Sequence, residues 1–215
     1  MAAALQERLR AGLGRLGLGL AEPQVAQLLG YLQLIQKWNK VYNLTAVREP
    51  GEMLTHHLLD SLAIVNPVRR QLGGESAELL DVGSGAGLPG IAVAICCPDL
   101  RVDCIDAVAK KAAFIQQAAA ELGLANLRGL HGRVQDVRHR YGLVICRAFA
   151  SLADFASWTD PVLAEHGLWL AMKGKTPTAE MADLPPRVEV FHVEQLEVPG
   201  LAADRCLVWM KRRAA

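Results

Sequence analysis

The sequence predicts an α/β protein in which a doubly wound, mostly parallel sheet is covered by helices on both faces and preceded by a helical segment. Two patterns support this prediction. From Leu79 onward, apolar runs typical of strands alternate with helical stretches, and that alternation calls for a parallel sheet. Before about residue 70 the apolar residues recur at helical spacing instead. We therefore expect a helical segment at 1–72 packed on the core and a sheet-forming domain at 73–215, joined at "QLGGES" (71–76).

The helical segment contains two clear helix signals. Pro23 can open a helix at its first turn, where a missing N–H removes no hydrogen bond. The apolar residues that follow keep to one broad face, namely Val25, Leu28, Leu29, Leu32, Ile35 and Trp38. "NLT" (43–45) and "REPG" (48–51) break this pattern. A further helix is expected through "EMLTHHLLDSLAIV" (52–65).

Strands and helices then alternate to the end of the chain. Strands are expected at 79–82, 101–105, 127–131, 142–146, 167–172, 187–196 and 205–211. Helices are expected at 89–96, 109–122 and 152–164. Only "EVPGLAAD" joins the last two strands, which is too short for a helical crossover, so we expect these strands to pair antiparallel.

Composition and charge exclude several classes of protein. The 215 residues are 52% hydrophobic and 21% charged, so the chain can bury a substantial core. The formal net charge is +1, from 23 Lys and Arg against 22 Asp and Glu. A protein that binds nucleic acid with its whole surface would be more basic, so any polyanion must meet a local patch. We find no signal peptide and no segment long enough to cross a membrane.

The cysteines and histidines point to neither disulfides nor a metal. The five cysteines form no C-x-x-C pair, and most of them lie inside apolar strand or helix patterns. We therefore expect reduced, buried thiols in a cytoplasmic protein. The six histidines show no spacing typical of metal ligands, so no metal site is expected.

A glycine-rich turn in "ELLDVGSGAGLPGIAVAIC" (78–96) is the first functional signal. Gly83, Gly85, Gly87 and Gly90 follow a short apolar run and precede a helical pattern. The G-x-G-x-x-G string is weak evidence alone, and a tight turn without a ligand is the plain alternative. Because the expected strand and helix flank it, we predict that this turn binds a ligand.

Two carboxylates help to identify that ligand. Asp106 ends the second expected strand, 19 residues after Gly87, where it can accept hydrogen bonds from ribose hydroxyls. Dinucleotides and S-adenosylmethionine share this adenosine, so Asp106 does not separate them. Asp81, at the tip of the first strand, suits a cationic amino-acid group better than a pyrophosphate. The chain is also too short for a hydride-transfer domain and has no Tyr-x-x-x-Lys set, so S-adenosylmethionine is the predicted cofactor.

Three cations are expected at the edge of the sheet where ligands bind. In sheets of this kind ligands bind outside the carboxyl ends of the strands. Arg147 lies at the end of the fourth strand, and Lys173 and Lys175 follow the fifth. Each cation alone is more often a solvated charge. Together, on a protein of near-zero net charge, they predict a local patch for a polyanion.

Several longer blocks resemble a known family. The blocks are "KWNKVYNLTAVREPGEMLTHHLLDSLAIV" (37–65), "LLDVGSGAGLPGI" (79–91), "GRVQDV" (132–137), "CRAFASL" (146–152) and "MKGK" (172–175). They resemble the bacterial ribosomal small-subunit methyltransferase G family, also called glucose-inhibited division protein B. The likeness runs from about Ala21 to Lys211, in order and at the expected spacing.

The resemblance implies a class I S-adenosylmethionine-dependent methyltransferase with a Rossmann-like sheet of seven strands, the last antiparallel. It implies methyl transfer to N7 of one guanine in 16S rRNA of the small ribosomal subunit. No membrane partner is expected, since no segment is long enough to cross a membrane, and no protein partner is predicted. Positions matching Gly83, Leu88, Val134, Gln135 and Arg147 bind the donor in the family. Many relatives have Glu at position 135, and the amide of Gln135 can still accept from the adenine amine. Our candidate donor site therefore comprises Asp81, Gly83, Gly85, Gly87, Leu88, Asp106, Val134, Gln135 and Arg147.

Guanine N7 has a lone pair and no proton, so its methylation needs positioning rather than a general base. Arg147 is the candidate catalytic residue, paired with either the donor's carboxylate or an RNA phosphate. The alternative is that Arg147 neutralises a nearby carboxylate, such as Asp81 or Asp106, and acts on stability. Cys146 is expected to be a packed strand cysteine rather than a nucleophile.

Residues of the family blocks are candidates for RNA contact. These candidates are Asn39, His57, Phe149, Lys173 and Lys175. Phe149 would stack on the target base, although a phenylalanine at such a place is more often core. Capping and helix–sheet hydrogen bonds explain Asn43 and Asp60 as well as RNA contact does. Two other functions remain open, a small-molecule methyltransferase and a non-enzymatic ribosome-assembly factor that senses the cofactor.

Overall fold

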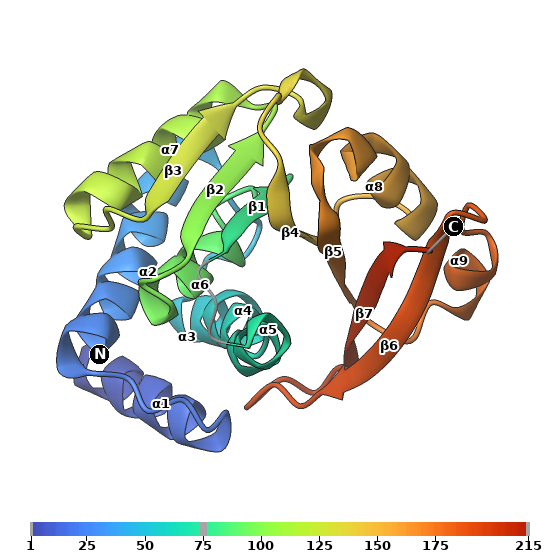
Figure 1. The fold of residues 1–215 in the computed structure, drawn as a ribbon. Helices are drawn as coiled ribbons and strands as arrows, with labels where there is room; N and C mark the ends of the chain where they lie inside the picture. Colours follow the sequence, from blue (N-terminus) through green and yellow to red (C-terminus); the bar gives the residue numbers. More distant parts are fainter. Residues whose placement is uncertain (1, 74–76, 214–215) are drawn as a thin grey trace.

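The computed structural model describes residues 2–73 and 77–213, and its centre is a seven-stranded sheet (Figure 1). The strands are β1 (Glu78–Val82), β2 (Arg101–Asp106), β3 (Leu127–His131), β4 (Tyr141–Arg147), β5 (Leu163–Lys173), β6 (Val188–Leu196) and β7 (Arg205–Arg212). Their order is β3-β2-β1-β4-β5-β7-β6. The first five strands pair in parallel, and β7 runs antiparallel to β5 and β6. The predicted sheet is confirmed, including its antiparallel last strand.

Helices cover both faces of this sheet, which explains why the central strands read as continuous apolar runs. Successive side chains of a strand point to opposite faces. In β4, Leu143 and Ile145 belong to the core under the N-terminal helices, while Val144 and Cys146 belong to the core under the helix that follows β4. All five cysteines of the chain are buried and free, as predicted.

The helices between strands are α6 (Gly90–Cys96), α7 (Ala109–Glu121), α8 (Leu152–Thr159) and α9 (Thr178–Ala182). The first two match the predicted ranges within a residue. The predicted helix at 152–164 was wrong at its end, because α8 stops at Thr159 and a 3-10 turn at Asp160–Val162 leads directly into β5. Pro161 lies in that turn, and a proline cannot donate the backbone hydrogen bond that would continue the α-helix.

The N-terminal part is helical, as predicted, but with more breaks. It contains α1 (Ala2–Arg15), α2 (Glu22–Tyr42), α3 (Pro50–Met53), a π-helical turn at Leu54–Leu59, α4 (Asp60–Leu62) and α5 (Val65–Leu72). The single helix predicted through 52–65 was wrong at its end, since a turn at 63–64 separates α4 from α5. Of the predicted joint, residues 74–76 lie outside the described residues. Gly73, in the left-handed conformation, caps α5.

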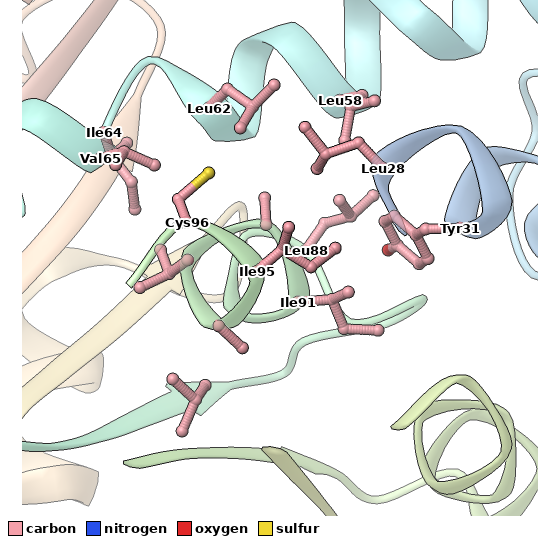
Figure 2. Close-up of a cluster of buried hydrophobic side chains, with 14 of the residues drawn as sticks. Leu28, Tyr31, Leu58, Leu62, Ile64, Val65, Leu88, Ile91, Ile95 and Cys96 are labelled. Atoms are coloured by element: carbon pink, nitrogen blue, oxygen red, sulfur yellow. The ribbon is translucent and has the colours of Figure 1, made fainter. Parts of the chain in front are cut away.

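A shared core joins the N-terminal helices to the helix that follows the glycine turn. Figure 2 shows Leu28 and Tyr31 of α2 beside Ile91 of α6, and all three are fully buried. The Tyr31 hydroxyl donates a hydrogen bond to the carbonyl of Ala86 in the glycine turn, at 2.6 Å. The N-terminal helices therefore contact the glycine turn directly and support its conformation. Because this core spans both parts, the division at residues 72 and 73 stays a prediction. Within the described ranges, no helix combines the length and apolar character needed to cross a membrane.

Candidate functional site

The glycine turn after β1 is drawn tightly against the end of β2. The amides of Gly83 and Ser84 both donate to the carbonyl of Ile105, at 2.9 and 3.2 Å. Gly83 and Gly87 have φ angles of 66° and 83°, which other residues rarely adopt. A Cβ atom on Gly83 would also lie only 2.3 Å from the ring of Phe149. The turn therefore requires glycine for both conformation and space.

Asp106 closes the turn from the neighbouring strand. Its Oδ2 accepts the amide of Gly85 at 3.0 Å, and its Oδ1 accepts the amide of Val108 at 2.9 Å. The ammonium group of Lys111 lies 3.7 Å from Oδ2. A carboxylate offers about four acceptor sites, so both oxygens can still accept from a ligand hydroxyl. Asp106 thus has the position and the capacity that the sequence predicted.

A cavity of about 480 Å³ opens beside Asp106, and we call it the first cavity. Its lining residues are Val82, Gly83, Ile105, Asp106, Ala107, Lys111, Gly132, Arg133, Val134, Gln135, Ala148, Phe149 and Trp158. The volume lies in the range of small-molecule sites, and a mostly apolar wall with a few polar groups is typical of them. Apolar Val134, the amide of Gln135 and the carboxylate of Asp106 suit a base and a ribose. The predicted residues at this wall therefore fit an adenosine-containing donor.

Other predicted donor-site residues lie beneath the turn rather than at the wall. Asp81 is fully buried, and its Oδ2 accepts the amide of Gly90 at 2.8 Å while its Oδ1 has no partner among the described residues. Burial raises the pKa of Asp81 to about 7. Leu88 is buried in the core, and Gly85 and Gly87 shape the turn without lining the cavity. Their contacts with a donor stay predictions.

A second cavity of about 400 Å³ lies at the carboxyl ends of β4 and β5. Its lining residues are His56, His57, Asp60, Arg147, Ala148, Met172, Lys173, Gly174 and Arg205. The two cavities share Ala148, which has a φ angle of 51° and follows Arg147 directly. The chain bend at Ala148 thus separates the first cavity, which has Asp106 in its wall, from the second, which is rich in cationic side chains.

Arg147, a predicted donor-site residue, lines the second cavity and not the first, so its contact with a donor stays a prediction. Its side chain is paired with a carboxylate of the N-terminal part. Its Nη1 donates to Asp60 Oδ2 at 3.1 Å and to the carbonyl of His56 at 3.4 Å. Asp60, buried at 2% exposure, also accepts from Nε of Arg205 at 2.7 Å. The alternative, that Arg147 neutralises a nearby carboxylate, agrees with this pair, although the hydrogen-bonded carboxylate is Asp60 rather than the suggested Asp81 or Asp106. The expected helix–sheet bonding of Asp60 is confirmed.

Lys173 and His57 also line the second cavity, and both have partners within the protein. Lys173 donates to Glu180 Oε2 at 2.8 Å and to the carbonyl of Ala150 at 3.0 Å. His57 Nε2 lies 2.5 Å from the hydroxyl of Thr45. Burial is the main cause that lowers the pKa of His57, so this imidazole is neutral near pH 7. Both residues can still meet RNA at the cavity wall, and that contact stays a prediction.

The remaining RNA candidates lie apart from one another. Asn39 is buried and shapes the loop after α2, since it accepts the amide of Thr45 and donates to the carbonyl of Val47. Lys175 is exposed after β5. Phe149 lies in the first cavity, where its ring packs on Gly83. Of these three, only Phe149 lines either cavity, so the structure does not gather the RNA candidates into one site.

Sequence reasoning missed some residues of both cavities. Trp158 of α8 lines the first cavity, is 41% exposed, and meets Phe149 edge to face at a ring distance of 5.8 Å. Lys111 and Arg133 add cations to the same wall. Arg205 of β7 lines the second cavity. Arg133 stands inside the recognised "GRVQDV" block, which could have indicated it, whereas no local signal distinguishes Trp158 or Arg205.

Comparison with known proteins identifies the family. The model of the family described as rRNA small subunit methyltransferase G, GidB, matches residues 24–208. The chain belongs to this family. A curated relative from Polaromonas sp. (strain JS666), named Ribosomal RNA small subunit methyltransferase G, is 61% identical over 98% of this chain and 95% of its own length. A relative of the same name from Acidovorax ebreus (strain TPSY) is also 61% identical, over 96% and 95%. The predicted family and the predicted enzyme class, a methyltransferase, are confirmed.

Solved structures confirm the class I methyltransferase fold. TrmN from Thermus thermophilus aligns with a TM-score of 0.59 at 16% identity, over 74% of this chain and 53% of that one. The N-methyltransferase NodS from Bradyrhizobium japonicum WM9, solved with S-adenosyl-L-homocysteine, aligns with a TM-score of 0.58 at 13% identity, over 83% and 100%. At such identities the likeness concerns the fold alone.

Proposed function

We propose that the protein transfers a methyl group from S-adenosylmethionine to N7 of a guanine in the 16S rRNA of the small ribosomal subunit. The observation that carries this proposal is the 61% identity, over nearly the whole chain, with relatives named Ribosomal RNA small subunit methyltransferase G. The arrangement of the two cavities supports it independently, because one suits the donor and the other an anionic acceptor.

The first cavity is where we place the donor. Asp106 would accept the ribose hydroxyls, Val134 would pack against the adenine, and Gln135 would accept from the adenine amine. The backbone of Gly83 can approach the ligand closely because glycine has no side chain. When bound, the donor supplies a methyl group on a positively charged sulfur, which a lone pair can attack.

The second cavity lies on the side where class I methyltransferases receive the acceptor, and three of its side chains are engaged within the protein. Asp60 accepts from two arginines, Lys173 donates to Glu180, and His57 contacts Thr45. Guanine N7 carries no proton, so positioning and charge complementarity are sufficient for its methylation.

Cys146 supports the same choice of acceptor atom. A methyltransferase acting on a pyrimidine carbon would need a reactive thiolate. Cys146 is 2% exposed on β4, and burial raises the pKa of its thiol well above the usual range. It is a packed strand residue rather than a nucleophile. A ribosomal substrate, together with five buried free thiols, favours the cytoplasm as the place of action.

The test is transfer of labelled methyl groups from S-adenosylmethionine to ribosomal subunits and RNA from a strain that lacks this protein. We expect label in 16S rRNA. Label only in small metabolites would indicate a small-molecule methyltransferase instead. Binding of the donor with no label in any fraction would indicate an assembly factor that only senses the cofactor.

A further inference from the structure

The second cavity contains one buried carboxylate that holds two arginines from distant parts of the chain. Asp60, at the start of α4, is 2% exposed. It accepts from Arg147, at the end of β4, and from Arg205, at the start of β7. These arginines lie 87 and 145 residues away in the sequence. A buried charge is stable only with such partners, so Asp60 and the two guanidinium groups form one unit.

Within the described part of the chain, this unit has one more positive charge than its carboxylate balances. Two arginines face one carboxylate, and neighbouring Lys173 is balanced by Glu180. Among the described residues, Arg147 uses only Nη1 as a donor, and Arg205 uses Nε and Nη1. A guanidinium has five N–H donors in a fixed plane, so both arginines have donors left for an anion. Their side chains are 21% and 25% exposed, which keeps them accessible from the cavity.

The position of the cavity indicates which anion binds. It adjoins the first cavity at Ala148 and lies at the carboxyl ends of β4 and β5 and the start of β7, away from Asp106. Exposed His56 in its wall and Lys175 in the loop after β5 extend the basic character beyond the arginines. One guanidinium group would be enough to bind the single carboxylate of the donor. A nucleic-acid strand presents a phosphate at every nucleotide, so it can use a wider basic surface.

We propose that the second cavity binds a phosphodiester group of the acceptor RNA through Arg205 and Arg147, and that Asp60 is the positioning residue that fixes both guanidinium groups for it. This inference rests on the proposed function. Asp60 itself meets no substrate. It acts by setting the distance and the plane of two like-charged groups, which would otherwise repel one another.

The Asp60→Asn variant separates positioning from simple charge. The substitution keeps the shape of the side chain and raises the net charge of the cavity by one. If only charge mattered, RNA binding would tighten. The positioning account predicts the opposite, a rise of at least about tenfold in KM for the small ribosomal subunit, because the arginines lose their common acceptor.

Asp103→Asn is the matched control, since it removes another buried carboxylate held by an arginine. Asp103 of β2 is 3% exposed and accepts from Arg128 at 2.6 and 2.7 Å, outside both cavities. We expect a comparable fall in melting temperature in the two variants, and an altered KM for the subunit only in Asp60→Asn. If KM for the small ribosomal subunit were the same in the two variants, Asp60 would be a structural residue, and its positioning role would be overturned.

Substitutions of Arg205 test whether a phosphate binds in the second cavity, and they do so even if Asp60→Asn fails to fold. Arg205→Gln should reduce the slope of log K against log salt for RNA binding by about 0.7 to 0.9, the value for one lost phosphate contact. Arg205→Lys should keep that slope but raise KM by at least about threefold, since lysine lacks the planar fork. The dissociation constant for S-adenosylmethionine, measured by calorimetry, should stay within twofold in both variants.

Two results would overturn the choice of ligand. An unchanged salt slope in Arg205→Gln would show that no phosphate is bound there. Weakened donor binding with unaltered RNA binding would show that the anion is the donor's carboxylate. A wild-type protein that transfers no methyl group to RNA would overturn the proposed function and this inference together, whereas normal wild-type transfer with unaltered Arg205 variants would overturn the inference alone.

Discussion

The two cavities are built in opposite ways although they share one residue. The first is centred on a turn and a strand end that are close in sequence: Gly85 and Asp106 are 21 residues apart and bond through a backbone amide. The rest of its wall comes from the segments that follow β3 and β4 and from Trp158 of α8. The second is formed by side-chain ion pairs between Asp60, Arg147 and Arg205, across 87 and 145 residues. One depends on backbone conformation, and the other depends on the N-terminal helices packing correctly on the sheet.

This difference favours separate roles for the two cavities, with donor binding in the first and acceptor binding in the second. A site centred on the turn after β1 and the end of β2 can keep its shape in many proteins of a fold, as a common cofactor requires. A site that needs a particular N-terminal extension can differ from one protein to another, as an acceptor requires. If the division is correct, substitutions in the first cavity alter donor binding, and substitutions in the second alter transfer to RNA.

The largest effect is expected from Asp106→Ala. The change removes the predicted ribose acceptors and leaves the amides of Gly85 and Val108 without their acceptor. We expect donor binding to weaken by about 1–3 kcal/mol, or roughly 5- to 150-fold. Calorimetry with S-adenosylmethionine measures this loss. An unchanged dissociation constant would show that the first cavity is not the donor site.

Arg147→Ala is expected to lower methyl transfer by at least about tenfold, equal to about 1.4 kcal/mol of transition-state stabilisation. We also expect a lower free energy of unfolding for Arg147→Ala, because buried Asp60 then keeps only Arg205 as its ion-pair partner. Arg147→Lys should rescue transfer poorly, since a point charge lacks the planar fork. Activity per folded molecule should be measured beside a thermal melt. A large fall in melting temperature with near-normal specific activity would make Arg147 purely structural.

Two glycines of the turn provide a matched pair for the first cavity. Both have a left-handed φ, 66° at Gly83 and 61° at Gly85, so alanine costs about 1–2 kcal/mol of strain at either. Only at Gly83 would the new methyl group collide with Phe149, whereas nothing lies within 4 Å at Gly85. We expect Gly83→Ala to weaken donor binding at least about fivefold more than Gly85→Ala does. Equal losses would mean that Phe149 does not shape the cavity.

The smallest effect concerns the pH dependence of stability through Asp81. Burial raises its pKa from 3.8 to about 7, against the hydrogen bond from Gly90 and the charge of Arg147, and with the help of Asp106. Between about pH 4 and pH 7 the folded protein holds a proton that the unfolded chain has lost. The contribution of this proton to the free energy of unfolding is therefore complete below about pH 4, and it is lost as pH rises through about 7.

Asp81→Asn removes this titration while keeping an oxygen for the amide of Gly90. The fall in melting temperature between pH 5 and pH 7.5 should therefore be smaller in the variant, by at least about 3 °C. Differential scanning calorimetry at the two pH values provides the comparison. Parallel curves for variant and wild type would show that Asp81 titrates near its ordinary pKa.

The sequence predicted the first cavity better than the second for a physical reason. Strand ends and the turns after them lie at one edge of a parallel sheet, so Gly83 and Asp106 could be placed together from their spacing. No such rule joins α4 to β4 and β7. The partner of Arg147 was therefore sought in Asp81 and Asp106, although the structure pairs it with Asp60.

The same contrast holds for the fold. The mostly parallel direction of the strands followed from the alternation of strands and helices, and it is confirmed. The π-helical turn at Leu54–Leu59 was not predicted, because its apolar residues read as an ordinary helix. Trp158 was missed because a tryptophan on a helix usually packs in the core, and its 41% exposure depends on how α8 meets the first cavity.

The claim that unites the two cavities is methylation of guanine N7, and the chemical stability of the product tests it most directly. N7-methylguanosine makes the RNA chain cleavable by borohydride followed by aniline, whereas methyl groups on exocyclic amines or 2′-hydroxyls do not. The 16S rRNA from a strain lacking this protein should be treated with the purified enzyme and labelled donor, then cleaved and mapped. We expect a single new break, at one guanine, that is absent with Asp106→Ala. Labelled RNA that resists cleavage would contradict the account, because the methyl group would then be on another atom.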